Sequence, residues 1–322
     1  MKKVIFDTDI GIDDAMALLF LHYSPAIDLQ AIVSGFGNAD IATTTRNALY
    51  IKEQFGIAAP VFRGASESIG PKLGEGFPDF VHGKNGLGDV QIEEPTTSHE
   101  SQPGAEAIVD IVQRNPHEIS IVAVGRLTNL ANAIDLCPEL PSLVHEVVIM
   151  GGAFGSNGHS GNVSPVAEAN IAGDPQAADK VLTADWPLAI VGLDVTHETT
   201  LDDQFFDALR SSAGPAGEFI YQISRFYLDF HVAISGKREC PMHDSSAVAY
   251  LLKPSLYKTR EAAVRVVTEG ISIGQTIAGD PAADYATDAW QDKPASQVCV
   301  EVDAAKVLDL YRETLALTRD DA

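Results

Sequence analysis

Residues 4–19 read Val4-Ile5-Phe6-Asp7-Thr8-Asp9-Ile10-Gly11-Ile12-Asp13-Asp14-Ala15-Met16-Ala17-Leu18-Leu19. The apolar run at 4–6 is typical of a parallel β-strand that is buried on both faces. Gly11 permits a tight turn, and Asp13 and Asp14 follow where the first turn of a helix favours negative charge. The stretch therefore predicts a buried strand that passes directly into a helix.

Four carboxylates, those of Asp7, Asp9, Asp13 and Asp14, fall within eight residues of this junction. At one strand end they repel one another, and without a cation some of them would hold protons near neutral pH. A hard divalent cation removes this conflict, and a stretch without Cys or His favours Ca²⁺ or Mg²⁺. Helix capping by solvated acids is the alternative interpretation.

Two other acidic motifs begin in a similar way. An EF-hand loop counted from Asp7 needs Gly and Glu where Ile12 and Leu18 stand, so this motif is excluded. A Mg²⁺-dependent phosphohydrolase of the haloacid dehalogenase type also starts with a strand and Asp-x-Asp, but it calls for Thr or Val in place of Gly11. That class stays an alternative, as does a non-catalytic protein that binds Ca²⁺ or ribose.

The composition limits the partners and the compartment. The chain has 322 residues, 45% of them hydrophobic, and a net charge of −23, which argues against nucleic acid and anionic membranes as partners. Its three cysteines are too few for a disulfide framework. No apolar signal segment or membrane-spanning run is visible, so a cytoplasmic protein is expected.

A zinc site at Cys240-x-x-His243 is disfavoured, because a second pair of ligands at the spacing of a zinc finger is missing.

Strand and helix patterns alternate along most of the chain. Strands are predicted at 27–36, 61–63, 119–124, 147–150, 188–195, 264–268 and 298–302, and helices at 41–55, 105–113, 175–182 and 304–317. The stretch 64–101 is rich in loops. We expect a single α/β domain over 1–322, with a mostly helical segment near 201–252 that caps the site. If it does, Phe226, Tyr227, Phe230 and His231 would flank a cleft, although aromatic residues at helical spacing more often belong to a hydrophobic core.

Motifs spread over the chain agree with one known family. They are Asp7-Thr8-Asp9-Ile10-Gly11-Ile12-Asp13-Asp14-Ala15, Gly35-Phe36-Gly37-Asn38, His82-Gly83-Lys84-Asn85-Gly86-Leu87, Arg126-Leu127-Thr128-Asn129, Glu168-Ala169-Asn170 and His243-Asp244. In this order they closely resemble the nucleoside hydrolase family, the Ca²⁺-dependent nucleoside N-ribohydrolases. The resemblance implies an open, mainly parallel α/β sheet flanked by helices, and a small-molecule ribonucleoside as the substrate.

The resemblance also implies roles for the metal ligands and the proton-transfer groups. Asp9, Asp14, Asp244 and the backbone carbonyl of Val124 would hold Ca²⁺, together with ribose hydroxyls and one water. Asp9 would also act as general base toward that water, and His243 would be the acid that helps the base depart. A His at this position is typical of the inosine-uridine-preferring branch, so broad or pyrimidine-leaning specificity is expected.

The remaining matches concern the nucleoside. Asp13 and Asn170 would fix ribose hydroxyls, Asn162 and Glu168 the 5′-hydroxyl, and Asn38 would reach the ribose, while His82 lies in the loop near the nucleoside. Glu168 and Asn170 are expected to share one face of a short extended segment. The family resemblance further implies a homo-oligomer, either a dimer or a tetramer.

Overall fold

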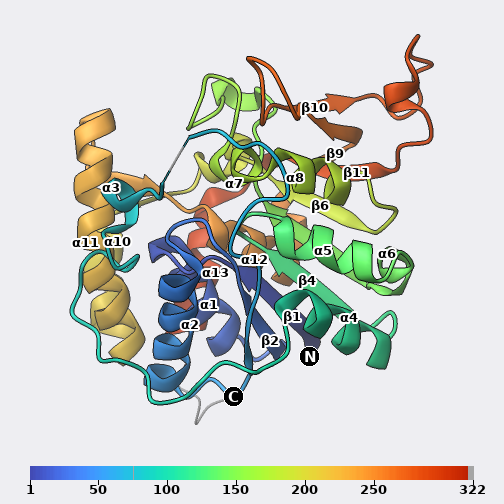
Figure 1. The fold of residues 1–322 in the computed structure, drawn as a ribbon. Coiled ribbons are helices and arrows are strands. Elements are labelled where there is room, and N and C mark those ends of the chain that lie inside the picture. Colours follow the sequence, from blue (N-terminus) through green and yellow to red (C-terminus); the bar gives the residue numbers. More distant parts are fainter. Residues whose placement is uncertain (75, 318–322) are drawn as a thin grey trace.

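The computed structural model describes residues 1–74 and 76–317, which form a large sheet with helices on both faces and a small second sheet (Figure 1). The helices of this part are α1 (Ile12–Tyr23), α2 (Ile41–Phe55), α3 (Asp79–His82), α4 (Gly104–Arg114), α5 (Thr128–Leu136), α6 (Leu140–Leu143), α7 (Ala169–Gly173), α8 (Pro175–Leu182), α9 (Leu193–Thr196), α10 (Asp203–Ser212), α11 (Gly214–Ser235), α12 (Asp244–Leu252) and α13 (Ala304–Leu315). The strands are β1 (Lys2–Thr8), β2 (Ile27–Ser34), β3 (Val61–Arg63), β4 (Ile119–Ala123), β5 (Glu146–Met150), β6 (Leu188–Val191), β7 (Thr200–Asp202), β8 (Glu239–Pro241), β9 (Tyr257–Val266), β10 (Thr276–Gly279) and β11 (Ala295–Val302).

The large sheet has the strand order β10-β9-β11-β6-β5-β4-β1-β2-β3. Every pair from β11 through β6 to β3 is parallel, and β9 and β10 add an antiparallel edge. The expected open, mainly parallel sheet is thus confirmed. From β1 the chain runs outward to β2 and β3, and from β4 it runs the other way to β5 and β6. Such a reversal leaves a crevice at the carboxyl ends of the strands, where open α/β sheets bind ligands.

Successive side chains along each strand point to opposite faces of the sheet, and they contribute to two hydrophobic cores, one on each face. In β1, Val4 and Phe6 belong to the core covered by α1, α2, α12 and α13, whereas Ile5 belongs to the core covered by α4, α5 and α8 (Figure 1). A strand with apolar side chains on both faces is buried on both sides, which explains the uninterrupted apolar run at 4–6. This burial holds the end of β1 rigidly at the crevice.

Several details of the secondary structure differ from the sequence-based expectation. The strand expected at 264–268 is part of β9, which already begins at Tyr257 and ends at Val266. The strand expected at 188–195 ends at Val191, and residues Leu193–Thr196 form the short helix α9 instead. A short apolar run fits a buried strand and a buried helical turn equally well, so periodicity cannot separate them. Strand β10 at the sheet edge was not expected, and the loop-rich stretch contains the short helix α3.

The mostly helical segment predicted near 201–252 contains α10, α11 and α12. Strand β7 directly precedes α10, and β8, which pairs with it, lies between α11 and α12 in the chain. Helix α11 stands at one side of the molecule beside α3 (Figure 1). Cys137, Cys240 and Cys299 are buried and carry free thiols. Among the described residues, no helix combines the length and apolarity that crossing a membrane requires.

Candidate active site

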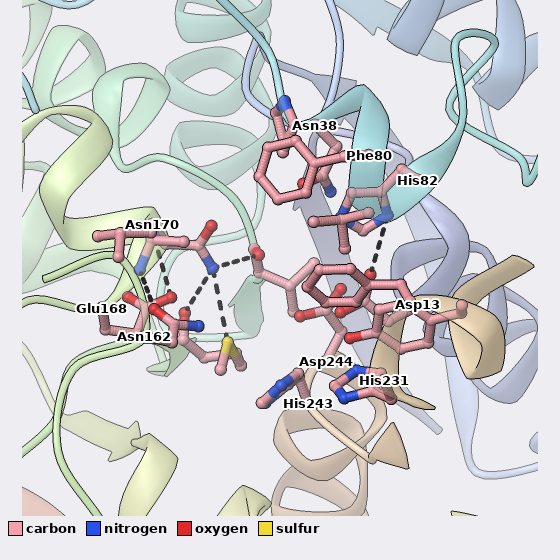
Figure 2. Close-up of a pocket in the computed structure, with 18 of the residues that line it drawn as sticks. Asp13, Asn38, Phe80, His82, Asn162, Glu168, Asn170, His231, His243 and Asp244 are labelled. Carbon is pink, nitrogen blue, oxygen red and sulfur yellow. Dashed lines mark hydrogen bonds and ion pairs between the residues drawn. The ribbon is translucent and has the colours of Figure 1, made fainter. Parts of the chain in front are cut away.

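A cavity of about 220 Å³ opens at the carboxyl ends of β1, β4 and β5 (Figure 2). It brings together nine of the side chains or backbone groups expected from the sequence, namely Asp13, Asn38, His82, Val124, Asn162, Glu168, Asn170, His243 and Asp244. In Figure 2 the group Asn162, Glu168 and Asn170 faces Asp13 and His82 across the cavity. Residues far apart in the sequence therefore converge at the carboxyl ends of the parallel strands, where the strand order leaves a crevice.

Three buried carboxylates form a cluster beside this cavity. One oxygen from each of Asp13, Asp14 and Asp244 lies within 4.8 Å of the others. Burial, and then the charge of Asp14, raises the pKa of Asp13 to about 8, and burial followed by the charge of Asp13 raises the pKa of Asp244 well above its usual range. Oδ1 of Asp13 is buried and has no hydrogen-bond partner in the described structure. An oxygen-only set with an unpartnered carboxylate oxygen fits a hard divalent cation.

Asp9 lies outside this group of three and lines an adjoining cavity of about 230 Å³. Its Oδ2 accepts a hydrogen bond from the backbone N–H of Asn38 at 2.8 Å, and its buried Oδ1 has no partner in the described structure. Glycine is required on both sides: a Cβ at Gly37 would lie 1.8 Å from Oδ2 and one at Gly125 would lie 2.5 Å from Oδ1. The metal role predicted for Asp9 stays a prediction.

The other acids of the first motif are fixed by hydrogen bonds. Asp14 accepts from Thr8 Oγ1 at 2.6 Å, from the N–H of Gly11 at 2.9 Å and from Asn38 Nδ2 at 2.7 Å. These donors hold its carboxylate at the start of α1. Asp7 instead accepts a hydrogen bond from Asn129 Nδ2 at 2.7 Å and lines neither cavity.

Glu168 and Asn170 reach the cavity in a different way from the one expected. The predicted extended segment is wrong, because Glu168 is the N-cap residue of α7 and its side chain accepts from the N–H groups of Asn170 and Ile171. A carboxylate at this position satisfies N–H groups that the helix itself leaves unpaired. Asn170 then turns its Nδ2 toward the carbonyl oxygens of Val124, at 2.7 Å, and Met150, at 3.2 Å.

The two predicted histidines are both buried at the cavity. His243 Nδ1 lies 2.8 Å from Thr196 Oγ1, and burial holds the pKa of His243 well below its usual value, with a further contribution from His197. His82 Nδ1 accepts a hydrogen bond from the N–H of Ile12 at 3.2 Å, and burial lowers its pKa to about 3. Each imidazole is therefore neutral near pH 7 and offers one donor and one acceptor.

Helix α11 supplies an aromatic wall. Tyr227, Phe230 and His231 line the cavity, the less common of the two arrangements weighed for these aromatic residues, whereas Phe226 packs against the hydrophobic core. Met150, Phe80, Val163, Ile234 and His197 also line the cavity and were not expected there from the sequence. Phe80, Val163 and Ile234 are exposed apolar residues, and single exposed apolar residues are too common to mark a site in a sequence.

A parallel sheet with buried carboxylates at its switch point, and with amides and imidazoles around the same cavity, defines an α/β protein whose cavity fits a small polar ligand and a divalent cation. The model of the inosine-uridine preferring nucleoside hydrolase family matches residues 4–309. Over 316 residues, 98% of this chain and 97% of the relative, the sequence is 38% identical to a probable uridine nucleosidase 2 of Arabidopsis thaliana.

A pyrimidine-specific ribonucleoside hydrolase, RihB of Escherichia coli O9:H4, is 35% identical, with 86% of this chain and 87% of the relative covered. The solved structure of a plant nucleoside hydrolase, PpNRh1, superposes with a TM-score of 0.94 at 36% identity and covers 98% of this chain and 99% of its own. The chain therefore belongs to the nucleoside hydrolase family and is an N-ribohydrolase, an enzyme that hydrolyses the N-glycosidic bond of ribonucleosides.

Proposed function

We propose that this nucleoside hydrolase uses Ca²⁺ and prefers inosine and uridine, with a leaning toward pyrimidine nucleosides. The observation that carries the proposal is one cavity with buried carboxylates on one side and a neutral, buried His243 beside Asp244. The names of the relatives, uridine nucleosidase and pyrimidine-specific ribonucleoside hydrolase, support the choice of base.

The proposed ligands of the cation are Asp9, Asp14, Asp244 and the carbonyl oxygen of Val124. The Val124 carbonyl already accepts from Asn170 Nδ2, but a carbonyl oxygen has a second lone pair to offer. When bound, the cation supplies positive charge that orients ribose hydroxyls and a water molecule and stabilises developing negative charge. Oxygen ligands of this kind favour Ca²⁺ over softer ions.

Each remaining residue has a task that its position supports. Asp9 takes a proton from the water that attacks C1′, and its unpartnered Oδ1 is suited to that role. Asp13, Asn38 and Asn170 hold the ribose, so that the sugar distorts toward an oxocarbenium-like state, and Asn162 and Glu168 hold the 5′-hydroxyl. His82 contacts the nucleoside from the opposite wall.

His243 assists the departure of the base. If the hydroxyl of Thr196 donates to Nδ1 of His243, Nε2 carries the proton and presents it to the leaving base. A positioned donor of this kind is worth about 10²–10⁴ in rate. We further propose that the chain folds as one domain over 1–322, acts in the cytoplasm, and forms a homodimer or homotetramer.

A panel of nucleosides and one nucleotide tests this function. Uridine and inosine should release free base, an added chelator should stop the release, and Ca²⁺ should restore it. Uridine 5′-monophosphate should scarcely react, because the carboxylate of Glu168 repels a phosphate at the 5′ position. Equal kcat/KM for uridine and its monophosphate would overturn the proposed 5′ contact. Activity that persists in the presence of chelator would overturn the proposed dependence on Ca²⁺.

A further inference from the structure

Asn47 forms hydrogen bonds to two loops of the site without lining the cavity itself. It lies in the middle of α2, is fully buried, and lines no part of the cavity. Its Nδ2 donates to the carbonyl oxygen of Ile10 at 3.1 Å and to that of Asn85 at 2.9 Å. Ile10 directly follows Asp9, and Asn85 lies in the loop that begins at His82. One side-chain amide thus ties the turn of the first motif to the neighbouring loop that begins at His82.

Hydrogen bonds within the loop 82–90 hold it together, so the contact with Asn47 positions the loop as a unit. The N–H of Gly88 donates to the carbonyl of His82 at 2.7 Å, and Asn85 Oδ1 accepts from the N–H groups of Leu87, at 2.8 Å, and Asp89, at 3.0 Å. Arg46, the neighbour of Asn47, adds a bond to the same Asn85 carbonyl at 3.2 Å.

Gly86 shows how closely the loop approaches α2. Its φ is +77°, and a Cβ at this position would lie 2.8 Å from Asn47 Nδ2. A positive φ together with this close approach is met at little cost only by glycine. The loop therefore packs against α2 in one position, where Asn47 and its neighbour Arg46 both donate to the carbonyl of Asn85 and Asn47 alone of the two also donates to Ile10.

The same two loops meet again inside the cavity, where Ile12 N–H donates to His82 Nδ1 at 3.2 Å. A neutral imidazole whose Nδ1 accepts a hydrogen bond carries its proton on Nε2. The bond between Ile12 and His82 needs the loop and the turn at a fixed separation, and the two bonds of Asn47 fix that separation. We propose that Asn47 is a positioning residue that holds the 82–90 loop against the turn after Asp9, so that His82 presents Nε2–H to the nucleoside.

This inference rests on the proposed contact of His82 with the nucleoside. Asn47→Leu keeps the side-chain volume but removes both donors. We expect kcat/KM for uridine to fall about tenfold, mostly through KM, because a contact to bound nucleoside is loosened. Thr45→Val is the matched control: Thr45 is buried on the same helix, and its Oγ1 bonds to Ile41 and Ser34 rather than to the loops. Its kcat/KM should stay within about twofold of wild type.

A double-mutant cycle with His82→Ala separates positioning from general damage. If Asn47 acts through His82, Asn47→Leu should change kcat/KM by less than about twofold in the His82→Ala background. Equal losses in both backgrounds, no loss from Asn47→Leu, or no loss from His82→Ala would each overturn the proposal. Gly86→Ala is a second variant, in case Asn47→Leu does not fold. Its Cβ would push the loop away from Asn47, so it should lower kcat/KM in the wild-type background and change it little in the His82→Ala background.

Amide hydrogen exchange tests whether Asn47 holds the 82–90 loop, and it does so independently of enzymatic activity. Amides of 82–90 should exchange about tenfold faster in Asn47→Leu than in wild type, and at wild-type rates in Thr45→Val. Unchanged exchange would overturn the proposed tie even if activity fell. A wild-type protein that released no base from uridine would instead contradict the proposed function, while the exchange result would still report on the tie.

Discussion

Asp9 differs from the other acids of the site in what surrounds it. One oxygen is held by the N–H of Asn38, the other has no partner, and glycines on both sides leave no room for a side chain. This arrangement leaves one oxygen available to a water molecule. The geometry thus separates Asp9 from Asp14, whose carboxylate already accepts four hydrogen bonds, including one from the backbone N–H of Asp9 itself.

We expect Asp9→Asn to reduce kcat for uridine by at least about 10²–10⁴, the usual value of a lost general base. The substitution is nearly isosteric, and the amide oxygen can keep the bond from Asn38. The measurement is initial rates at saturating Ca²⁺ and uridine. Asp7→Asn is the control, because Asp7 lies two residues away but lines neither cavity. A variant Asp9→Asn with most of the wild-type kcat would show that another group activates the water.

His243 and Asp244 are adjacent, yet they are expected to act on different parts of the substrate. His243→Ala should slow uridine or inosine hydrolysis by about 10²–10⁴, because these bases leave poorly without a proton or hydrogen bond. It should leave p-nitrophenyl riboside within about tenfold, since p-nitrophenolate is stable as an anion. Asp244→Ala should harm both substrates and weaken Ca²⁺ binding, because the cation serves the ribosyl group that both share.

Comparing the two substrates in both variants distinguishes these roles. Parallel losses on the nucleoside and the activated riboside for His243→Ala would mean that His243 shapes the cavity rather than donating a proton. Calcium titration of Asp244→Ala by calorimetry, with His243→Ala as the control, measures the metal contribution independently of turnover.

At the scale of elements, the start of α7 combines a structural task and a binding task in one side chain. Glu168 accepts from the N–H groups of Asn170, Ile171 and Gly152 at 2.9, 3.1 and 3.0 Å. Removing it leaves three N–H donors without this partner, two of them in buried hydrogen bonds. Each unsatisfied buried group costs about 1–3 kcal/mol, so Glu168 links the stability of this element to the site.

We therefore expect Glu168→Ala to lower the free energy of unfolding by at least about 1–3 kcal/mol and also to raise KM for uridine. Urea unfolding and steady-state kinetics measure the two effects. Asp202→Ala is the matched control, because Asp202 caps α10 through the N–H of Phe205 and lines neither cavity of the site. It should cost about 1 kcal/mol without a change in KM. A stable Glu168→Ala variant would contradict the capping role.

The elements also show what the sequence could predict. The bounds of α2 and β3 were predicted correctly, and β1 and α1 were located, because the signals that mark them, apolar runs and the residues that bound them, are local in the sequence. The polar residues of the cavity were found through motifs. The short helix α7 was mistaken for an extended segment, since a side chain that caps its own helix leaves no periodic signal. Phe80 and Ile234 were missed because only tertiary packing brings them to the cavity.

At the scale of the whole molecule, buried acids make stability depend on pH and on the metal. Burial raises the pKa of Asp7 to about 7, and burial with the charge of Asp14 raises that of Asp13 to about 8, against 3.8 for an ordinary aspartate. Between about pH 4 and pH 8 the buried acids of the metal-free folded chain thus hold protons that they release in the unfolded chain. Burial lowers the pKa of four histidines, which act in the opposite direction below about pH 6.5, but burial raises the pKa of six acids, so the acids set the sign. These acids are Asp7, Asp9, Asp13, Asp14, Glu168 and Asp244, and the histidines are His82, His197, His231 and His243. Stability falls with rising pH wherever the folded state binds more protons.

The metal-free protein should therefore have a lower Tm at pH 8 than at pH 5. Ca²⁺ should raise Tm more at pH 8, because at pH 5 it must displace protons from the carboxylates that bind it. Differential scanning calorimetry with chelator or excess Ca²⁺ at both pH values measures this. Asp7→Asn should make the Tm of the metal-free protein depend less on pH, because it removes one buried acid. The amide oxygen of the new side chain can still accept the hydrogen bond from Asn129. A metal-free Tm that rises from pH 5 to pH 8, or an equal effect of Ca²⁺ at both, would mean that the acids are ionised without the cation.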